Sequence, residues 1–246
     1  MGNPVVHFEI IGSDGPALEK FYGELFGWHI NSNPELKYGT VETHGGQGIN
    51  GGIGTFQEGD KYVTFYAAVP DLQATLDKVS KLGGKTIAPP MDIPGVVTFA
   101  QFEDPQGNRI GIIKGSEGEQ APAVEAGDGA PVTWFEVIGP NPSALDAFYR
   151  DLFGWSTKKS AGDQYEYYEV DTQGGAGTNG GIGSSPDGNP HVTVYAEVDD
   201  VQKFLERAES LGGKTAMPPM NPTPDLTIGI IEDPQGNLFG LYKHQH

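Results

Sequence analysis

An internal repeat constrains this 246-residue chain more than any other feature of its sequence. The stretch ALEKFYGELFGW at 17–28 returns as ALDAFYRDLFGW at 144–155, an offset of 127 residues (144 − 17). Later in each copy, YVTFYAAVPD at 62–71 returns as HVTVYAEVDD at 191–200, and both halves contain NGGIG and EDPQGN. Blocks in the same order at nearly constant spacing indicate a tandem duplication.

Each copy contains two modules of the form strand, helix, three strands. In the first module, 5–11 is β-branched and apolar, Asp14 can cap the helix that follows, and Gly27 can end it. Short strand-like runs follow near 28–31, 37–44 and 49–56, and a second such cycle begins at 62. The sequence therefore predicts an α+β fold with four βαβββ modules, forming curved mixed sheets with concave clefts.

The repeat also predicts domain boundaries. Between the copies lies a segment rich in Gly, Ala, Pro and Glu, which is the composition of an exposed linker. We expect one domain at 1–114, a linker at 115–131 and a second domain at 132–246.

Composition narrows the possible partners. The chain has 33 acidic and 15 basic residues, a net charge of −18, which argues against nucleic acid and anionic membranes as partners. It has no cysteine and no apolar run long enough for a membrane helix. Because MGNPVVHFEI lacks the basic and apolar regions of a secretory signal, we expect no such signal. We expect a cytoplasmic protein, monomeric or homodimeric, whose partner is a small molecule.

The phrases FYGELFGW, FYRDLFGW and DPQGN resemble the vicinal oxygen chelate superfamily, which includes glyoxalase I, extradiol dioxygenases and bleomycin-resistance proteins. The resemblance covers almost the whole chain except the linker. It implies a small-molecule cleft in which His, Glu or Gln side chains on four strands hold a divalent metal ion.

Most positions that the resemblance assigns to metal ligands carry other residues here. In the first copy three of these positions carry His7, Thr64 and Gly111, of which only the histidine can bind a metal ion in the expected way. In the second copy the same positions carry Trp134, Thr193 and Gly240, and none of these is an expected ligand. The fourth ligand strand, which contains NGGIG in both copies, has no carboxylate. A catalytic metal needs about three protein ligands, so we expect no metal and no other cofactor. A divalent metal held by unorthodox ligands is the alternative.

The two glycines allow two interpretations. Glycine in a strand either permits close packing or lets a ligand approach the backbone. On the second interpretation the pocket becomes roomier and more apolar, and an indole on its wall offers a stacking surface. The expected pocket residues are Trp134, Thr64, Thr193, Gly111, Gly240, Tyr38, Glu42 and Tyr167.

Carboxylates on the same strand faces are candidates for proton transfer. Side chains alternate along a strand, so Glu9 shares a face with His7, and Glu136 shares a face with Trp134. His7, Glu9 and Glu136 are therefore the candidate catalytic residues. The competing interpretation is that both glutamates are structural carboxylates bonded to neighbouring strands.

The ranges 46–51 and 175–180 both fit the pattern G-x-G-x-x-G. A dinucleotide site requires this loop to lead from a strand into a helix. Another strand follows here, so the pattern predicts a glycine-rich connection between strands.

Three functions remain open. The first is a metal-independent binder of a flat, partly apolar organic molecule, of the glyoxalase or bleomycin-resistance type. The second is a lyase or isomerase that uses acid–base groups without metal. The third is a metal-dependent glyoxalase or dioxygenase with unorthodox ligands.

Overall fold

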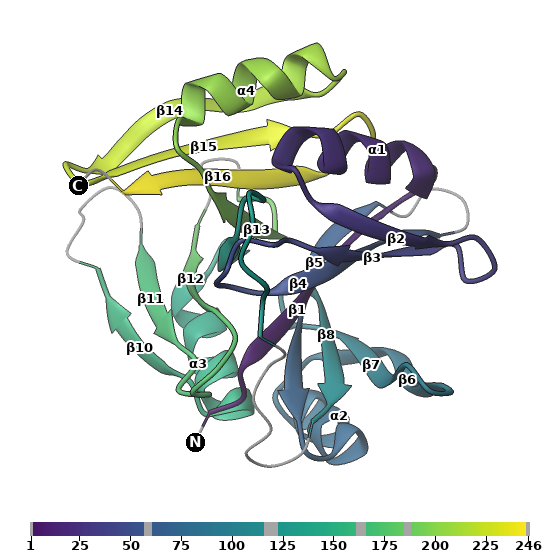
Figure 1. Cartoon of the computed structure of the whole chain (residues 1–246). Coiled ribbons are helices and arrows are strands. Elements are labelled where there is room, and N and C mark those ends of the chain that lie inside the picture. Colours follow the sequence, from purple (N-terminus) through teal and green to yellow (C-terminus); the bar gives the residue numbers. More distant parts are fainter. Residues whose placement is uncertain (1, 57–60, 116–122, 161–165, 185–187, 245–246) are drawn as a thin grey trace. The chain divides into compact units, whose positions relative to one another are not determined.

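The computed structural model describes residues 2–56, 61–115, 123–160, 166–184 and 188–244, and its strands and helices confirm the predicted α+β fold (Figure 1). The first copy contains β1 (Val5–Gly12), α1 (Gly15–Phe26), β2 (His29–Asn33), β3 (Tyr38–Glu42), β4 (Asn50–Thr55), β5 (Tyr62–Val69), α2 (Leu72–Lys81), β6 (Lys85–Ile93), β7 (Val97–Glu103) and β8 (Arg109–Lys114). The second contains β9 (Val132–Ile138), α3 (Pro142–Phe153), β10 (Ser156–Lys159), β11 (Tyr167–Asp171), β12 (Asn179–Gly183), β13 (His191–Glu197), α4 (Val201–Ser210), β14 (Lys214–Thr223), β15 (Leu226–Glu232) and β16 (Leu238–His244). These are the four predicted βαβββ modules.

The first helix of each copy begins and ends where the sequence predicts. The Asp14 carboxylate accepts a hydrogen bond from the backbone N–H of Ala17, three residues on, which satisfies one of the free donors of the first turn. Gly27 ends α1 with a φ of 71°, in the left-handed region that glycine tolerates best. Asn141 and Gly154 have the same roles at the two ends of α3.

The strands form two eight-stranded sheets with the same order in each copy. The order is β2-β3-β4-β1-β5-β8-β7-β6 in the first and β10-β11-β12-β9-β13-β16-β15-β14 in the second. Pairing is parallel between β5 and β8 and antiparallel in the outer strands, so each sheet is mixed, as predicted.

In space the residues group into two compact units that combine the copies. Unit 1 consists of Met1–His7, Thr64–Pro122 and Phe135–Val192. Unit 2 consists of Phe8–Val63, Ala123–Trp134 and Thr193–His246. Each unit joins the second module of one copy to the first module of the other, with α2 beside α3 in unit 1 and α1 beside α4 in unit 2 (Figure 1).

The domain boundaries at 1–114 and 132–246 follow the repeat in the sequence and stay a prediction. Residues 116–122 of the predicted linker lie outside the described residues.

Two repeated motifs explain how modules from different copies pack together. In unit 2 the Tyr22 hydroxyl of the first copy donates to the Asp233 carboxylate of the second, at 3.1 Å. In unit 1 the Tyr149 hydroxyl donates to Asp104, at 2.8 Å. Burial, with the neighbouring carboxylate, holds the pKa of both phenols well above the usual 10. The tyrosine of the FY motif and the aspartate of the DPQGN motif therefore form a structural pair between the copies.

The aromatic residues of the FYGELFGW motif are buried in the core of unit 2. The Tyr22 ring stacks on Trp28 with centroids 5.8 Å apart and planes 10° apart. Phe26 packs against Trp28 and Phe239. Burial of such large rings removes apolar surface from water and so stabilises unit 2.

Candidate functional site

In unit 1 the strands that carry the first copy's predicted ligand positions bring His7 and Tyr66 together. Their rings meet edge to face, with centroids 5.8 Å apart. The Tyr66 hydroxyl accepts a hydrogen bond from the Gln101 side-chain amide at 2.7 Å. Gly111 of β8 pairs with Tyr66 in the parallel register, and with Gln101 in the antiparallel one. We call His7, Thr64, Tyr66, Gln101 and Gly111 the first-copy site.

The glycine of this site is required for packing. A Cβ at Gly111 would overlap the Tyr66 ring. The same holds in unit 2, where a Cβ at Gly240 would overlap the Tyr195 ring. Tyrosine rings from the neighbouring strands lie against both glycines, so the structure shows the close packing that was one of the two interpretations. That a ligand also reaches these glycines stays a prediction.

Desolvation lowers the pKa of His7, although its side chain stays partly exposed. The pKa of the imidazole falls from 6.5 to about 4, because a charged ring packed against protein atoms would lose much of its hydration. The ring is therefore neutral at pH 7. A base this weak contributes little driving force for proton abstraction near neutrality.

Thr64 uses its hydroxyl within the sheet. The side chain is fully buried, and its Oγ1 donates to the backbone carbonyl of Arg109 at 2.7 Å. This bond satisfies the buried hydroxyl, as buried polar groups generally require.

In unit 2 the equivalent strands carry Trp134, Thr193, Tyr195, Ile230 and Gly240, which we call the second-copy site. Gly240 pairs with Tyr195 and with Ile230. Ile230 stands where the first copy has Gln101, so the second-copy wall is more apolar. Thr193 is 1% exposed, and its hydroxyl has no hydrogen-bond partner among the described residues. Its equivalent in the first copy, Thr64, does have one.

The two candidate carboxylates are each bonded to a tyrosine. Glu9 of unit 2 is 8% exposed and accepts from the Tyr62 hydroxyl at 3.3 Å. Burial and the nearby Glu9 raise the pKa of Tyr38 well above 10. In unit 1, Glu136 accepts from the Tyr167 hydroxyl at 2.8 Å. These bonds are those expected of structural carboxylates, and a catalytic role for either glutamate stays a prediction.

The rings of Tyr38 and Tyr167 also lie on glycines. A Cβ at Gly52 would overlap Tyr38, and one at Gly181 would overlap Tyr167. The carboxylate-free NGGIG strands are therefore covered by tyrosines as well.

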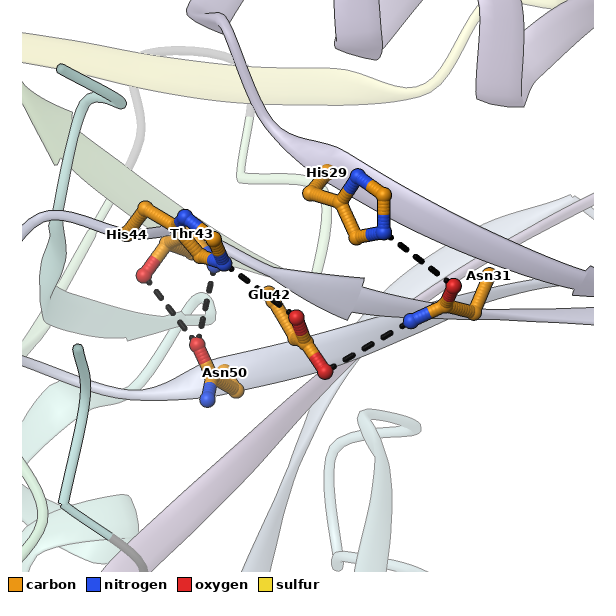
Figure 2. A network of polar contacts seen from close by, with 6 residues as sticks. All are labelled: His29, Asn31, Glu42, Thr43, His44 and Asn50. Atoms are coloured by element: carbon orange, nitrogen blue, oxygen red, sulfur yellow. Dashed lines mark hydrogen bonds and ion pairs between the residues drawn. The ribbon is translucent and has the colours of Figure 1, made fainter. Parts of the chain in front are cut away.

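Glu42, predicted for the pocket, belongs to an exposed network on β2 and β3 (Figure 2). Its carboxylate lies 3.2 Å from the His44 Nε2 and accepts from the Asn31 amide at 3.5 Å. His29 contacts the same Asn31 at 3.1 Å (Figure 2). The sequence offered no reason to single out these neighbours.

Sequence reasoning also missed the tyrosines and Gln101 of the two sites. Tyr66 follows Thr64 by two positions, so alternation along β5 places both on one face. The same spacing relates Tyr195 to Thr193. A tyrosine on the same strand face as the predicted threonine, with a glycine opposite it in the paired strand, is the sequence pattern that could have identified Tyr66 and Tyr195.

Two further features concern metal-binding groups and membrane-spanning helices. Within the described ranges, no three His, Cys, Asp or Glu side chains are arranged to hold a metal ion. In the same part of the chain, no helix is both long and apolar enough to cross a membrane.

Comparison with known proteins identifies the family. The model of the Glyoxalase/Bleomycin resistance protein/Dioxygenase superfamily matches residues 5–112 and 132–241. A protein of Mycobacterium tuberculosis provisionally named glyoxylase CFP32 is 28% identical over 240 residues, covering 94% of this chain and 91% of that protein. The anthracycline biosynthesis protein DauV of Streptomyces sp. strain C5 is 27% identical over 260 residues, covering 96% and 91%.

Solved structures share the fold at lower identity. The Mn(II)-bound glyoxalase from Novosphingobium aromaticivorans matches with a TM-score of 0.68 at 16% identity, over 100% of this chain and 82% of that one. The 2,3-dioxygenase LapB from Pseudomonas sp. KL28 matches with a TM-score of 0.70 at 13% identity, over 100% and 94%. The match of the family model to both copies shows that the chain belongs to the glyoxalase/bleomycin resistance protein/dioxygenase superfamily.

Proposed function

We propose that the chain binds a flat, partly apolar organic molecule at the second-copy site, without the metal ion that the family resemblance implies. The observation that carries this proposal is the buried hydroxyl of Thr193, which finds no hydrogen-bond partner in the part of the chain that the structure describes. A hydroxyl removed from water without a partner costs about 1–3 kcal/mol. A ligand that offers a polar atom there would recover that cost on binding.

The neighbouring strand supplies a surface for stacking. Trp134 lies on β9, next to β13 in the sheet, and its side chain is only partly buried. The two other tryptophans, Trp28 and Trp155, are 5% and 3% exposed and belong to the core. An indole offers a large apolar face and one donor, which suits a planar ring system. DauV is named for the biosynthesis of anthracyclines, which are flat polycyclic molecules, and this supports the choice of ligand class.

The donor set of the first-copy site does not fit the implied metal. His7 offers a neutral nitrogen, but the Thr64 hydroxyl is already bonded to a backbone carbonyl. Gly111 has no side chain, and the Tyr66 ring covers it. A catalytic site needs about three protein ligands, so these residues support a metal-independent function.

Lyase or isomerase chemistry in the first copy is the alternative proposal. The group that would move a proton is the neutral imidazole of His7 in unit 1 or, separately, the buried carboxylate of Glu9 in unit 2. The low pKa of His7 and the Tyr62 bond to Glu9 favour the binding function instead.

Tryptophan fluorescence can test the binding function directly. A panel of anthraquinones, naphthoquinones and matched non-planar compounds is titrated against the intact chain. We expect planar members to quench fluorescence saturably and to raise the melting temperature. Trp134→Ala is expected to weaken binding about tenfold, because aromatic anchors commonly contribute a kcal/mol or more.

A second variant, Thr193→Val, and its control, Thr64→Val, distinguish the loss of the binding site from misfolding of the chain. Thr193→Val keeps the side-chain shape but removes the hydroxyl, and we expect weaker binding with the fold intact. Thr64→Val in the other copy is expected to leave affinity unchanged. Normal binding by both second-copy variants would refute the assignment.

A further inference from the structure

The two glycine-rich loops that fit G-x-G-x-x-G have nearly the same backbone. In the first copy His44, Gly46 and Gly48 have φ values of 51°, 71° and 79°. Their counterparts Gln173, Gly175 and Gly177 have 52°, 69° and 78°. In both copies an asparagine holds the loop: Asn50 accepts from the Thr43 N–H and hydroxyl (Figure 2), and Asn179 accepts from Thr172 in the same way. We call 43–48 the first loop and 172–177 the second loop.

In unit 2 another segment of the chain pairs with the first loop. Gly45 forms an antiparallel bridge with Ala126, and the Gly46 N–H donates to the Glu125 carbonyl at 3.0 Å. Ile49 continues the pairing by donating to the Val132 carbonyl at 2.9 Å. Residues 123–132 therefore lie along the whole first loop.

In unit 1, among the described residues, the second loop keeps a counterpart only of the pairing that Gly45 and Ile49 make with Pro131 and Val132. Thr178 donates to the Val5 carbonyl at 3.0 Å, which matches the Ile49 bond. A Cβ at Gly174 would meet Pro4, as one at Gly45 would meet Pro131.

The rest of the second loop has no such neighbour among the described residues. A Cβ at Gly175 would meet nothing within 4 Å, whereas one at Gly46 would lie 3.4 Å from the Ala126 Cβ. As far as the described residues go, the place that Glu125 and Ala126 fill in the first copy is a hollow in the second, lined by Asp171–Gly177 and Asn179.

We propose that this hollow binds an extended peptide segment of another protein, by the pairing that 123–128 shows on the first loop. The Gly175 N–H would donate to a peptide carbonyl, and a small residue would follow at the position of Ala126, since that methyl group already lies close to Gly46. The loop is held in the receptive conformation by Asn179, so little ordering is needed on binding. Addition of a short strand to free backbone groups is a known mode of peptide recognition.

The test uses the intact chain and the acetylated, amidated peptide AVEAGD, which has the sequence of 123–128. In a 15N NMR titration we expect saturable shifts of the amides at 174–177. The amides at 43–48 are expected to stay in place, because residues 123–128 already occupy the first loop. Absence of shifts at 174–177 with several millimolar peptide would overturn the proposal.

Two changes test the geometry. Gly175→Asn keeps a residue that tolerates positive φ and places a side chain where the peptide would lie, so binding should weaken at least tenfold. Independently of that variant's fold, a peptide with Trp in place of the alanine should not bind the natural chain. Equal binding by either one would contradict the proposed pairing.

Discussion

The first-copy and second-copy sites stand on equivalent strands and differ in the polarity of their walls. Both have a buried threonine and a tyrosine ring that lies on a glycine. The first copy adds an imidazole and an amide, whereas the second adds an indole and an isoleucine; these are His7 and Gln101 against Trp134 and Ile230. The shared tyrosine–glycine pair is therefore scaffold, and the positions around it are where the copies have diverged.

The hydroxyl groups of the two threonines sharpen this difference. Thr64 donates to a backbone carbonyl, while Thr193 has no partner among the described residues. Buried polar groups in proteins are nearly always hydrogen-bonded, because an unbonded one lowers the free energy of unfolding. A threonine with only a structural role would be expected to have a partner, so we favour the second copy as the ligand site.

The largest effect is expected from placing a carboxylate at the predicted ligand position that carries a glycine in each copy. Gly111→Glu in the first copy, or Gly240→Glu in the second, forces a side chain into a tyrosine ring and buries an unpaired charge. We expect a loss of at least about 3 kcal/mol in the free energy of unfolding, measured by urea denaturation. Adding Tyr66→Ala to Gly111→Glu should recover part of that loss. A stable single variant would show that the ring does not fill the space beside the glycine.

The next largest effect is a pH dependence of the free energy of unfolding, which His7 contributes in the first copy and Trp134 does not contribute in the second. Because the folded pKa of His7 is about 4, the unfolded chain takes up this proton first as pH falls below 6.5. Stability present above pH 6.5 is therefore lost between pH 6.5 and about 4. Because the ring is only half-buried, the loss in the free energy of unfolding should stay below the roughly 3 kcal/mol that a fully buried imidazole would give.

The control for this pH effect is His7→Gln. Its free energy of unfolding should fall less steeply with acidification than that of the natural chain. Trp134→Gln, at the equivalent position, should keep the natural pH slope. Parallel curves for His7→Gln and the natural chain would contradict a depressed pKa.

The smallest effect is the expected difference in stability between removing the Thr64 hydroxyl and removing the Thr193 hydroxyl. Thr64→Val breaks a buried hydrogen bond and should destabilise the ligand-free chain by about 1 kcal/mol. Thr193→Val removes a hydroxyl that bonds to none of the described residues, so stability should stay unchanged or rise slightly. Equal losses in thermal unfolding would mean that Thr193 has a partner in solution, such as a bound water.

The elements of the fold could be predicted from sequence because local chemistry determines them. Asp14 and Gly27 mark the ends of α1 through backbone rules that need no tertiary contact. The pairing of modules could not be predicted, because both copies carry the same motifs. By sequence Tyr22 could bond Asp104 as well as Asp233, and only the packing of the whole chain decides.

The candidate site was harder to predict for a related reason. Gly111 in a strand is compatible with an open pocket or with a covering ring, and the choice depends on how the Tyr66 side chain is turned. Likewise the sequence contains two equivalent threonines, Thr64 and Thr193, and does not say which hydroxyl finds a carbonyl. Such choices depend on neighbouring strands distant in sequence.

Metal content tests most directly whether these two sites function without the family's metal. The tag-free chain is dialysed against Mn²⁺, Fe²⁺, Ni²⁺ or Zn²⁺, freed of excess ion and measured by elemental analysis. We predict less than about a tenth of an ion per chain, because the positions in question supply fewer than about three ligands. About one ion per chain that His7→Ala removes would contradict a metal-free first-copy site.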